Sequence, residues 1–384
     1  MYDILTLNKI AKIGLDKLGT NYNVSDNVQN PDGILVRSAA MHDMQFGDNL
    51  KAIARAGAGT NNIPVERCAE EGIVVFNTPG ANANAVKELV ICGLFLASRD
   101  ITEGVKWTST LKNEGDAAAK LVEKGKGQFA GHEIAGKKIG VIGLGAIGVM
   151  VANAAHSLGM QVFGYDPYIS VDAAWGLSRS IIHVNNINDI FAQCDYITIH
   201  VPLNPSTKYT INNETLALCK DGVRILNFSR NELVNNEALI AGLESGKVAR
   251  YVTDFPSADL IDVKNIVCIP HLGASTEESE DNCAVMAARE IRDYLENGNI
   301  SNSVNFPNCS APREGVMRIC VMHKNVPTMI SQITNAVSAV NVDNMINKSK
   351  GDYAYTILDL SEEHEEAADS ISSIDGVIRV RIIK

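Results

Sequence analysis

Short apolar runs alternate with polar segments along most of the chain, a pattern typical of buried parallel strands joined by helices. In the first part of the chain these runs lie at 34–36, 50–54 and 73–76, separated by polar helical or turn segments. From Asn84 to about Arg99 apolar residues recur three and four positions apart, which predicts a helix. This region is therefore predicted to be an α/β domain.

A second α/β region is organised around the sequence GLGAIG at 143–148. An apolar run leads into it, a helical pattern follows, and a second apolar run ends at Asp166. The glycines permit a tight turn, close approach of a pyrophosphate and close packing of the helix on the strand. The helix N-terminus offers N–H groups and the positive end of the dipole to the phosphates.

Asp166 is placed to accept hydrogen bonds from an adenosine ribose, so the stretch predicts dinucleotide binding. The alternative is a crossover that binds nothing, which leaves Asp166 unexplained. NAD is preferred over NADP because a carboxylate would repel a 2′-phosphate. The cofactor contacts predicted here are Gly143, Gly145, Ala146, Ile147, Gly148 and Asp166.

Four more strands are predicted to extend the sheet of the second region, and a long helix is predicted to follow the last of them. A helix at 236–246 and another from about Ser275 to Leu295 accompany these strands, and a loop rich in Asn, Ser and Pro follows at 297–312. The strands are predicted at 196–203, 223–230, up to 253–255, and at 266–270.

The C-terminal segment predicts a small split βαββαβ domain without an obvious catalytic cluster. Its elements are predicted as a strand at 316–322, a helix opened by Pro327, strands at 340–346 and 353–359, an acidic helix at 362–374 and a strand at 377–383.

Composition excludes several classes of protein. A chain of 384 residues with 46% hydrophobic and 21% charged residues is expected to form two or three globular domains. The eight cysteines are scattered without metal spacing, which favours reduced thiols and no metal. No apolar run has the length of a membrane span and no signal peptide is evident, so we expect a cytoplasmic protein. The net charge of −11 argues against nucleic acid but still allows a local basic pocket for a small anion.

Arg37 and Arg55 lie at the ends of two predicted strands, at the edge where open α/β sheets bind ligands. Glycine-rich loops follow at 55–62 and 77–82, and such loops can hold an anion with main-chain N–H groups. The alternative for each loop is ordinary turn chemistry.

Hydride transfer from a 2-hydroxy acid requires a positive partner for the carboxylate and a base for the hydroxyl proton. Arginine binds a carboxylate through two parallel bonds, and histidine titrates near neutrality. An acid beside the histidine would favour its charged form and fix its tautomer. Arg230, Asp259 and His271 could supply these roles from loops after strands. Alternatively, Arg230 is a surface charge and His271 caps the next helix.

With these residues in view, the chain resembles the D-isomer-specific 2-hydroxyacid dehydrogenases, and within them members with a C-terminal ACT domain. The motifs that carry the resemblance are 36–38, 55–59, 77–79, 143–166, 227–230 and 270–276. The resemblance implies a flavodoxin-like substrate domain (1–87 with 276–300), a Rossmann NAD domain (88–275), a linker (301–314) and an ACT domain (315–384).

The resemblance also implies roles for single residues. Arg230 is expected to bind the substrate carboxylate and polarise the carbonyl, His271 to act as acid and base, and Asp254 to contact the nicotinamide amide. The further cofactor contacts it implies are Pro202, Ser229, Arg230, His271 and Gly273. The substrate contacts it implies are Arg37, Ser38, Arg55, Gly57, Asn77, Gly80, Ala81, Arg230 and His271.

The sequence departs from the family pattern at two points near these residues. Asp259 stands where the family usually has glutamate beside the histidine, and Asn231 follows Arg230 where the family usually has glycine.

In the ACT segment, His323, Asn325 and Asn341 match positions that bind serine at a domain interface in the same enzymes. Thr328 replaces the glycine that follows the proline in serine-sensitive members. The alternative for these residues is ordinary polarity at strand ends and turns.

The expected activity is NAD-dependent oxidation of 3-phospho-D-glycerate to 3-phosphohydroxypyruvate, the first step of phosphorylated serine biosynthesis. The alternatives are dehydrogenation of another D-2-hydroxy acid, such as glycerate, lactate or 2-hydroxyglutarate, and an NAD(H)-sensing binding module. We expect a homodimer or homotetramer, with the polar stretch 112–132 either a solvated face or an arm over a partner subunit.

Overall fold

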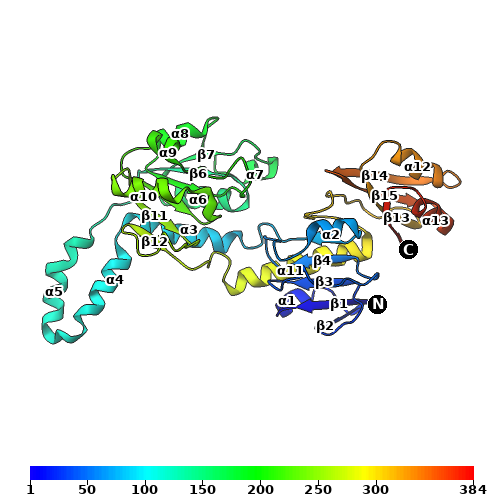
Figure 1. The fold of residues 1–384 in the computed structure, drawn as a ribbon, viewed down its shortest axis with the longest axis horizontal. Helices are drawn as coiled ribbons and strands as arrows, with labels where there is room; N and C mark the ends of the chain where they lie inside the picture. Colours follow the sequence, from blue (N-terminus) through cyan, green and yellow to red (C-terminus); the bar gives the residue numbers. More distant parts are fainter. The chain divides into compact units, whose positions relative to one another are not determined.

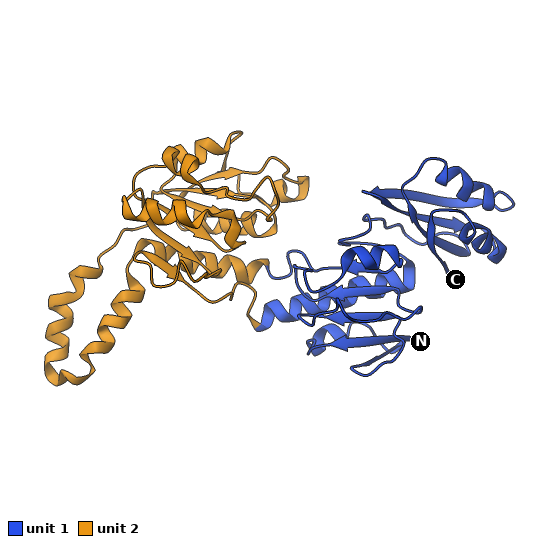
Figure 2. Cartoon of the chain, in the orientation of Figure 1, with its two compact units in different colours: residues 1–82, 277–384 blue, residues 83–276 orange.

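The structure, a computed structural model, describes residues 1–384 and divides into two compact units. One unit contains residues 1–82 and 277–384, and the other contains residues 83–276 (Figure 2).

The first unit begins with a five-stranded parallel sheet in the order β2-β1-β3-β4-β5. The expected flavodoxin-like order is confirmed, because the strand order reverses between β1 and β3. Its elements are β1 (Tyr2–Leu7), α1 (Lys12–Leu15), β2 (Tyr22–Ser25), β3 (Gly33–Val36), β4 (Ala52–Arg55), α2 (Val65–Glu70), β5 (Val74–Phe76) and α11 (Glu277–Asn297) (Figure 1).

Both faces of this sheet are covered, as its continuous apolar strands predict. Successive strand residues point to opposite faces. Leu35 and Ala54 therefore pack in one core with Ala287 and Ile291 of α11. Their neighbours along the strands, such as Ile34 and Ile53, pack in a second core on the other face.

The second unit contains a seven-stranded parallel sheet in the order β12-β11-β10-β9-β6-β7-β8. The order reverses at β6, which is the arrangement expected of a Rossmann domain. Its strands are β6 (Lys138–Ile142), β7 (Gln161–Tyr165), β8 (Ile182–His183), β9 (Tyr196–Ile199), β10 (Val223–Asn227), β11 (Val248–Thr253) and β12 (Ile266–Cys268).

Helices cover both faces of this sheet and enclose separate cores. The helices of the unit's main body are α3 (Ala83–Ser98), α6 (Ala146–Ser157), α7 (Val171–Gly176), α8 (Ile187–Gln193), α9 (Asn213–Leu218) and α10 (Asn236–Glu244), with a 3-10 turn η4 at Asn231–Leu233.

The polar stretch after α3 forms an arm of two helices that extends away from the sheet of its unit (Figure 1). Trp107 and Phe129 hold its two sides together with ring centroids 5.3 Å apart. The arm consists of α4 (Ile101–Thr110), η1 (Leu111–Asn113), η2 (Gly115–Ala117), α5 (Ala118–Gly125) and η3 (Lys126–Phe129).

The C-terminal domain has the predicted βαββαβ order in an antiparallel sheet, β14-β15-β13-β16. The ferredoxin-like fold is therefore confirmed, although β14 extends four residues beyond the predicted end at Ile346. Its elements are β13 (Met317–Lys324), α12 (Met329–Ala336), β14 (Val342–Lys350), β15 (Tyr353–Leu360), α13 (Glu365–Ser372) and β16 (Val377–Ile383).

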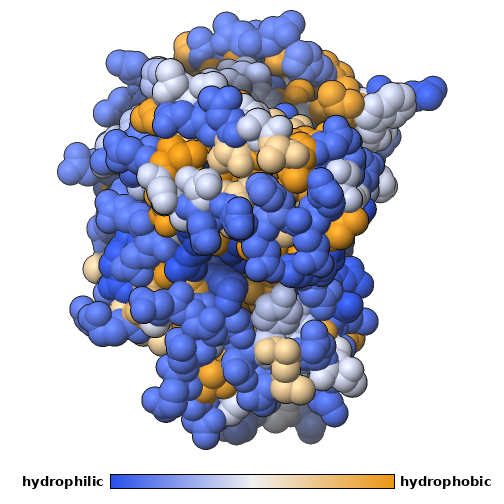
Figure 3. Space-filling view, turned by 90° about the vertical axis from the view of Figure 1, so that its right-hand side faces the viewer, coloured by the Kyte–Doolittle hydropathy of each residue, from blue (hydrophilic) through white to orange (hydrophobic).

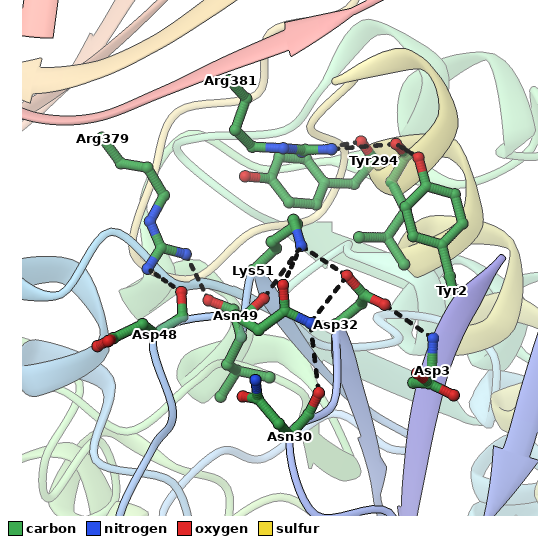
Figure 4. Close-up of polar contacts among 12 residues, drawn as sticks. Tyr2, Asp3, Asn30, Asp32, Asp48, Asn49, Lys51, Tyr294, Arg379 and Arg381 are labelled. Carbon is green, nitrogen blue, oxygen red and sulfur yellow. Dashed lines mark hydrogen bonds and ion pairs between the residues drawn. The ribbon is translucent and has the colours of Figure 1, made fainter.

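One face of this sheet packs on its own helices, and the other shares a core with the first sheet and α11. Arg381 lies over the ring of Tyr294, 4.4 Å from its centroid, and donates to the carbonyls of Tyr294 and Leu295 near the end of α11. Arg379 donates to the carbonyls of Leu50 and Asp48 (Figure 4). Two arginines of β16 thus tie the small sheet to the rest of its unit.

The segment expected to be a linker is packed along the edge of the first sheet. Ser303 forms an antiparallel bridge with Phe76, the Asn305 side chain bonds both Val75 N–H and Ile73 C=O, and Phe306 is fully buried. The segment therefore packs against the edge of the sheet through one bridge and the Asn305 side chain, although its Asn, Ser and Pro content predicts a loop.

The surface in Figure 3 is mostly hydrophilic, with hydrophobic residues scattered in small groups. Among the helices of the chain, none combines the length and apolarity needed to cross a bilayer.

Candidate active site

The glycine motif has the geometry that its sequence predicts. Gly143 follows β6 with φ +93°, a conformation that side chains disfavour. A Cβ at Gly148 would lie 1.9 Å from the Gly143 carbonyl oxygen, whereas a Cβ at Gly145 would meet no atom within 4 Å. The third glycine therefore lets α6 pack on β6, and the second leaves open space at the helix N-terminus.

Asp166 follows β7 and holds the glycine turn. One carboxylate oxygen accepts from Leu144 N–H at 2.9 Å, and the other accepts from Tyr168 N–H at 2.8 Å. A carboxylate has about four lone-pair sites, so both oxygens can still accept from ribose hydroxyls.

The predicted catalytic arginine and histidine are linked by an aromatic ring. The Arg230 guanidinium lies 5.7 Å from the centroid of Phe255, and the His271 ring lies 4.4 Å from the same ring. These residues follow β10, β11 and β12 at the carboxyl edge of the sheet. Phe255 was not predicted as a site residue, although it directly follows Asp254, because stacking between loops has no local sequence signal.

Asp254 is the buried carboxylate of this edge. One oxygen accepts from Gly273 N–H at 3.2 Å, and the other has no hydrogen-bond partner. Burial raises the pKa of Asp254, and the charge of His271 offsets part of this shift. Leaving a buried acceptor without a hydrogen bond costs free energy. A bound group that donates a hydrogen bond to this oxygen would remove that cost.

Asp259 is exposed and bonded away from the predicted histidine. It accepts from the Asn236 amide at 2.8 Å, and hydrogen bonds from Ser257 and Asn236 lower its pKa. No hydrogen bond or ion pair joins Asp259 to His271. The structure therefore brings Arg230 and His271 together, but it does not place Asp259 beside them.

His200, at the end of β9, is not a second candidate base. Burial lowers its pKa to about 3, and its Nε2 lies 2.9 Å from the Thr198 hydroxyl. Pro202 follows it, and the Ser229 hydroxyl donates to Ile199 C=O at 2.9 Å, so these positions line the same edge.

The predicted substrate residues of the first unit also gather at the carboxyl edge of their sheet. Arg55 Nε donates to Arg37 C=O at 3.1 Å, and Asn77 Nδ2 donates to Ala58 C=O at 2.6 Å. A Cβ at Gly57 would lie 2.3 Å from the Arg55 side chain. Of the remaining predicted members, Ser38 lies in the loop after β3, and Gly80 and Ala81 lie in the loop after β5.

The Arg37 side chain pairs with Glu280 in the first turn of α11, at 2.6 Å. Glu280 was not among the predicted residues. Arg37 is therefore already paired with a carboxylate of the chain, which a substrate anion would have to displace.

Comparison with known proteins agrees with this geometry. Residues 94–273 match the family described as D-isomer specific 2-hydroxyacid dehydrogenase, NAD binding domain. The chain is 33% identical over 324 residues to the D-3-phosphoglycerate dehydrogenase of Methanocaldococcus jannaschii, covering 82% of this chain and 59% of that protein. It is 35% identical over 290 residues to the D-3-phosphoglycerate dehydrogenase of Homo sapiens, covering 72% of this chain and 51% of that protein.

A crystal structure of NAD+-bound 3-phosphoglycerate dehydrogenase from Entamoeba histolytica matches with a TM-score of 0.60 at 27% identity. The match covers 79% of this chain and 98% of that chain. Residues 94–273 therefore carry the NAD-binding domain of the D-isomer-specific 2-hydroxyacid dehydrogenases.

This chain spans between half and three fifths of the length of the two curated 2-hydroxyacid dehydrogenases. Its predicted cofactor, NAD, is confirmed by the family match. The residues fit this group: the nicotinamide amide can donate to the unpaired oxygen of Asp254, and the open space at Gly145 can admit a pyrophosphate.

In the C-terminal domain, the predicted serine-binding residues do not converge within one chain. His323 pairs with Ala354 at one end of β15, whereas Asn341 C=O accepts from Ser361 N–H just beyond its other end. His323 is buried, with Nδ1 on Lys324 C=O and Nε2 on the Thr356 hydroxyl. The Asn325 amide donates to Gly351 C=O at 3.1 Å.

Proposed function

We propose that this chain oxidises 3-phospho-D-glycerate to 3-phosphohydroxypyruvate with NAD, the first step of phosphorylated serine biosynthesis. The observation that carries the reaction type is the Arg230–Phe255–His271 arrangement on the sheet that also bears the cofactor turn. The two curated relatives described above are named for this substrate.

Each residue has a chemical task in this proposal. Arg230 holds the substrate carboxylate with two parallel hydrogen bonds and polarises the oxygen at C2. His271 takes the hydroxyl proton as the C2 hydrogen leaves as hydride, and it returns a proton in the reverse direction. Bound NAD supplies the hydride acceptor. Phe255 restricts both side chains, which reduces the entropy cost of aligning them.

The phosphate is assigned to Arg37 and Arg55 in the first unit. The Arg37–Glu280 pair is exposed on both sides, so its exchange for a substrate anion costs little. Glycerate and lactate lack the dianionic group that these two arginines suit.

Asp259 is proposed as the acid that orients His271. To do so it must exchange its bond with Asn236 for one with the histidine. Serine regulation is also proposed, and it requires two copies of the chain, because one copy separates Asn341 from His323 and Asn325. We assign self-association to the two-helix arm, where Ile101 and Val105 are exposed apolar residues. A cytoplasmic location stays a prediction.

The direct test is NADH oxidation by purified protein with a panel of 2-oxo acids across pH. We expect 3-phosphohydroxypyruvate to be reduced with the highest kcat/KM, and Arg230→Gln to lower kcat/KM by about 10²-fold or more. Preference for pyruvate or glyoxylate would contradict the phosphate assignment. Binding of NADH without oxidation of it at any pH would favour the binding module.

Serine binding is tested separately by calorimetry on the full chain. We expect serine to bind the wild type and Asn341→Ala to abolish binding. The absence of any heat would remove the feedback proposal without affecting the dehydrogenase assignment.

A further inference from the structure

A polar pocket lies in the first unit between the last residues of β14 and the packed segment after α11. Its volume is about 430 Å³. Asn77 of the predicted substrate loop 77–82 forms part of its wall. The pocket therefore borders both this loop and the hairpin of β14 and β15 in the ACT domain, the ACT hairpin. The lining residues are Asn77, Asn302, Ser303, Pro307, Asn308, Lys348, Ser349 and Lys350.

Two lysines of one strand face this pocket from the same side. Lys348 and Lys350 are two positions apart on β14, so they share a face of the strand. They lie opposite Tyr355 and Tyr353 in the antiparallel register. Lys324 of β13 is also paired with Tyr353, and its ammonium lies 4.2 Å from the centroid of that ring.

The positive charge at this pocket is not neutralised by the chain. Neither Lys348 nor Lys350 has a carboxylate within 4.0 Å, and the lining contains no acidic residue. This local positive charge contrasts with the net charge of −11 of the whole chain. Lysines without acidic partners beside a concave surface attract anions.

Unused hydrogen-bond donors accompany the charge. Lys350 Nζ donates to Ser303 C=O at 3.0 Å, which leaves two of its three protons. Burial lowers the pKa of Lys350, so a bound anion would stabilise its charged form. The Asn308 amide and the Ser349 hydroxyl make no hydrogen bond within the chain.

From these contacts we infer that this pocket, the lysine pocket, is a binding site for a small phosphate-type oxyanion. Two ammonium groups suit a dianion, since lysine acts on phosphate as a point charge without demanding a planar partner. The volume admits inorganic phosphate or a small phosphorylated acid.

Occupation of the pocket would couple the ACT hairpin to the substrate loop. Asn77 N–H donates to Asn302 C=O at 3.3 Å, and both residues line the pocket. The Asn302 amide donates in turn to Glu290 of α11 at 2.7 Å. A ligand held by Lys348 and Lys350 would therefore lie beside the Asn302 backbone that holds Asn77 in place. Its binding would alter the affinity for the substrate.

The inference goes beyond the proposed dehydrogenase and does not depend on it. Its test is calorimetric titration of the full chain with inorganic phosphate, in an Arg55→Gln background that weakens the proposed substrate site. The variant is Lys348→Gln/Lys350→Gln. The matched control is Lys12→Gln/Lys17→Gln, which removes the same charge from two exposed lysines of the same unit.

We expect phosphate to bind the Arg55→Gln protein and the control alike, and the lysine-pocket variant to bind at least tenfold more weakly. Equal binding by the variant and the control would overturn the inference, as would loss of all phosphate binding on Arg55→Gln alone. If the double variant does not fold by circular dichroism, the single variant Lys348→Gln replaces it, with a loss of several-fold expected.

A second titration with 3-phospho-D-glycerate in the same background identifies the source of the oxyanion. Tighter binding than inorganic phosphate indicates a phosphorylated acid, and equal or weaker binding indicates the free ion. NADH oxidation by the lysine-pocket variant without phosphate should match the wild type, which separates this site from the catalytic one.

Discussion

At the scale of single residues, the candidate active site depends on contacts between distant loops. Arg230 and His271 both lie against the ring of Phe255. Asp254 keeps a buried oxygen without a partner beside them. Asp259, which the family resemblance places next to the histidine, accepts a hydrogen bond from Asn236. The hydrogen-bond partners of Asp254 and Asp259 therefore determine which of the two carboxylates can assist the proposed proton transfer by His271.

Replacement of Asp259 by asparagine tests its assignment. A carboxylate near His271 favours the charged imidazolium that donates a proton to the 2-oxo acid. We expect Asp259→Asn to lower kcat/KM about tenfold and to start the high-pH loss of NADH oxidation at a lower pH. Stopped-flow or steady-state rates between pH 6 and 9 measure both effects. An unchanged profile would leave Asp254 as the only carboxylate that acts on the histidine.

Glu290 makes a prediction about stability. It is buried in α11, and burial raises its pKa to about 8. In the unfolded chain its pKa is about 4.3, so between these values the folded chain holds a proton that the unfolded chain releases. Stability should therefore fall as pH rises from about 5 to 8 and level off above it.

The variant Glu290→Gln keeps an acceptor for Asn302 but cannot ionise. We expect the urea concentration at its unfolding midpoint to fall less between pH 5 and pH 8 than that of the wild type. At pH 8 this midpoint should be higher than that of the wild type. Parallel curves for the two proteins would show that Glu290 does not carry the effect.

At the scale of elements, most of what the sequence could predict is local. The glycine turn and the βαββαβ order both follow from residues close together in the chain. The packing of 301–314 along β5 could not be predicted, because the Asn305 side chain finds its partners more than two hundred residues away. The Arg230–Phe255 contact and the Asn236–Asp259 hydrogen bond could not be predicted either, because each joins side chains that follow different strands or lie on different elements.

The turn at β6 and α6 predicts the effect of one methyl group. Gly148→Ala would place a Cβ 1.9 Å from the Gly143 carbonyl oxygen, so α6 must move away from the turn. We expect NADH affinity, measured by fluorescence titration, to fall more than tenfold. Gly127→Ala, where a Cβ meets no atom within 4 Å, is the control and should bind as the wild type does. Equal affinities would contradict the assigned cofactor turn.

Thr328 occupies a conformation that favours glycine. It precedes α12 with φ +66°, which costs a β-branched residue about 1 kcal/mol or more. We expect Thr328→Gly to raise the free energy of unfolding by about 0.5–1 kcal/mol. Thr328→Ala, which keeps a Cβ, should gain less. A loss of stability in Thr328→Gly would show that the hydroxyl contact with Gln332 outweighs the strain.

At the scale of the whole chain, the ACT domain and the substrate sheet form one unit. Arg318 is fully buried on β13, where it pairs with Asp359 and donates to Asn297 C=O and Pro312 C=O. The last turns of α11 accept from Arg381 of β16, while its first turn pairs with Arg37. One helix therefore runs from the predicted regulatory domain to the predicted substrate site.

The central claim is that this chain is an NAD-dependent dehydrogenase for a phosphorylated 2-hydroxy acid. The most direct measurement is kcat/KM in NADH oxidation with 3-phosphohydroxypyruvate and with 3-hydroxypyruvate, which lacks only the phosphate. We predict a preference for the phosphorylated acid of about 10²-fold in the wild type, reduced at least tenfold by Arg55→Gln. Equal rates with both acids in the wild type, or an equal effect of Arg55→Gln on both, would contradict the account.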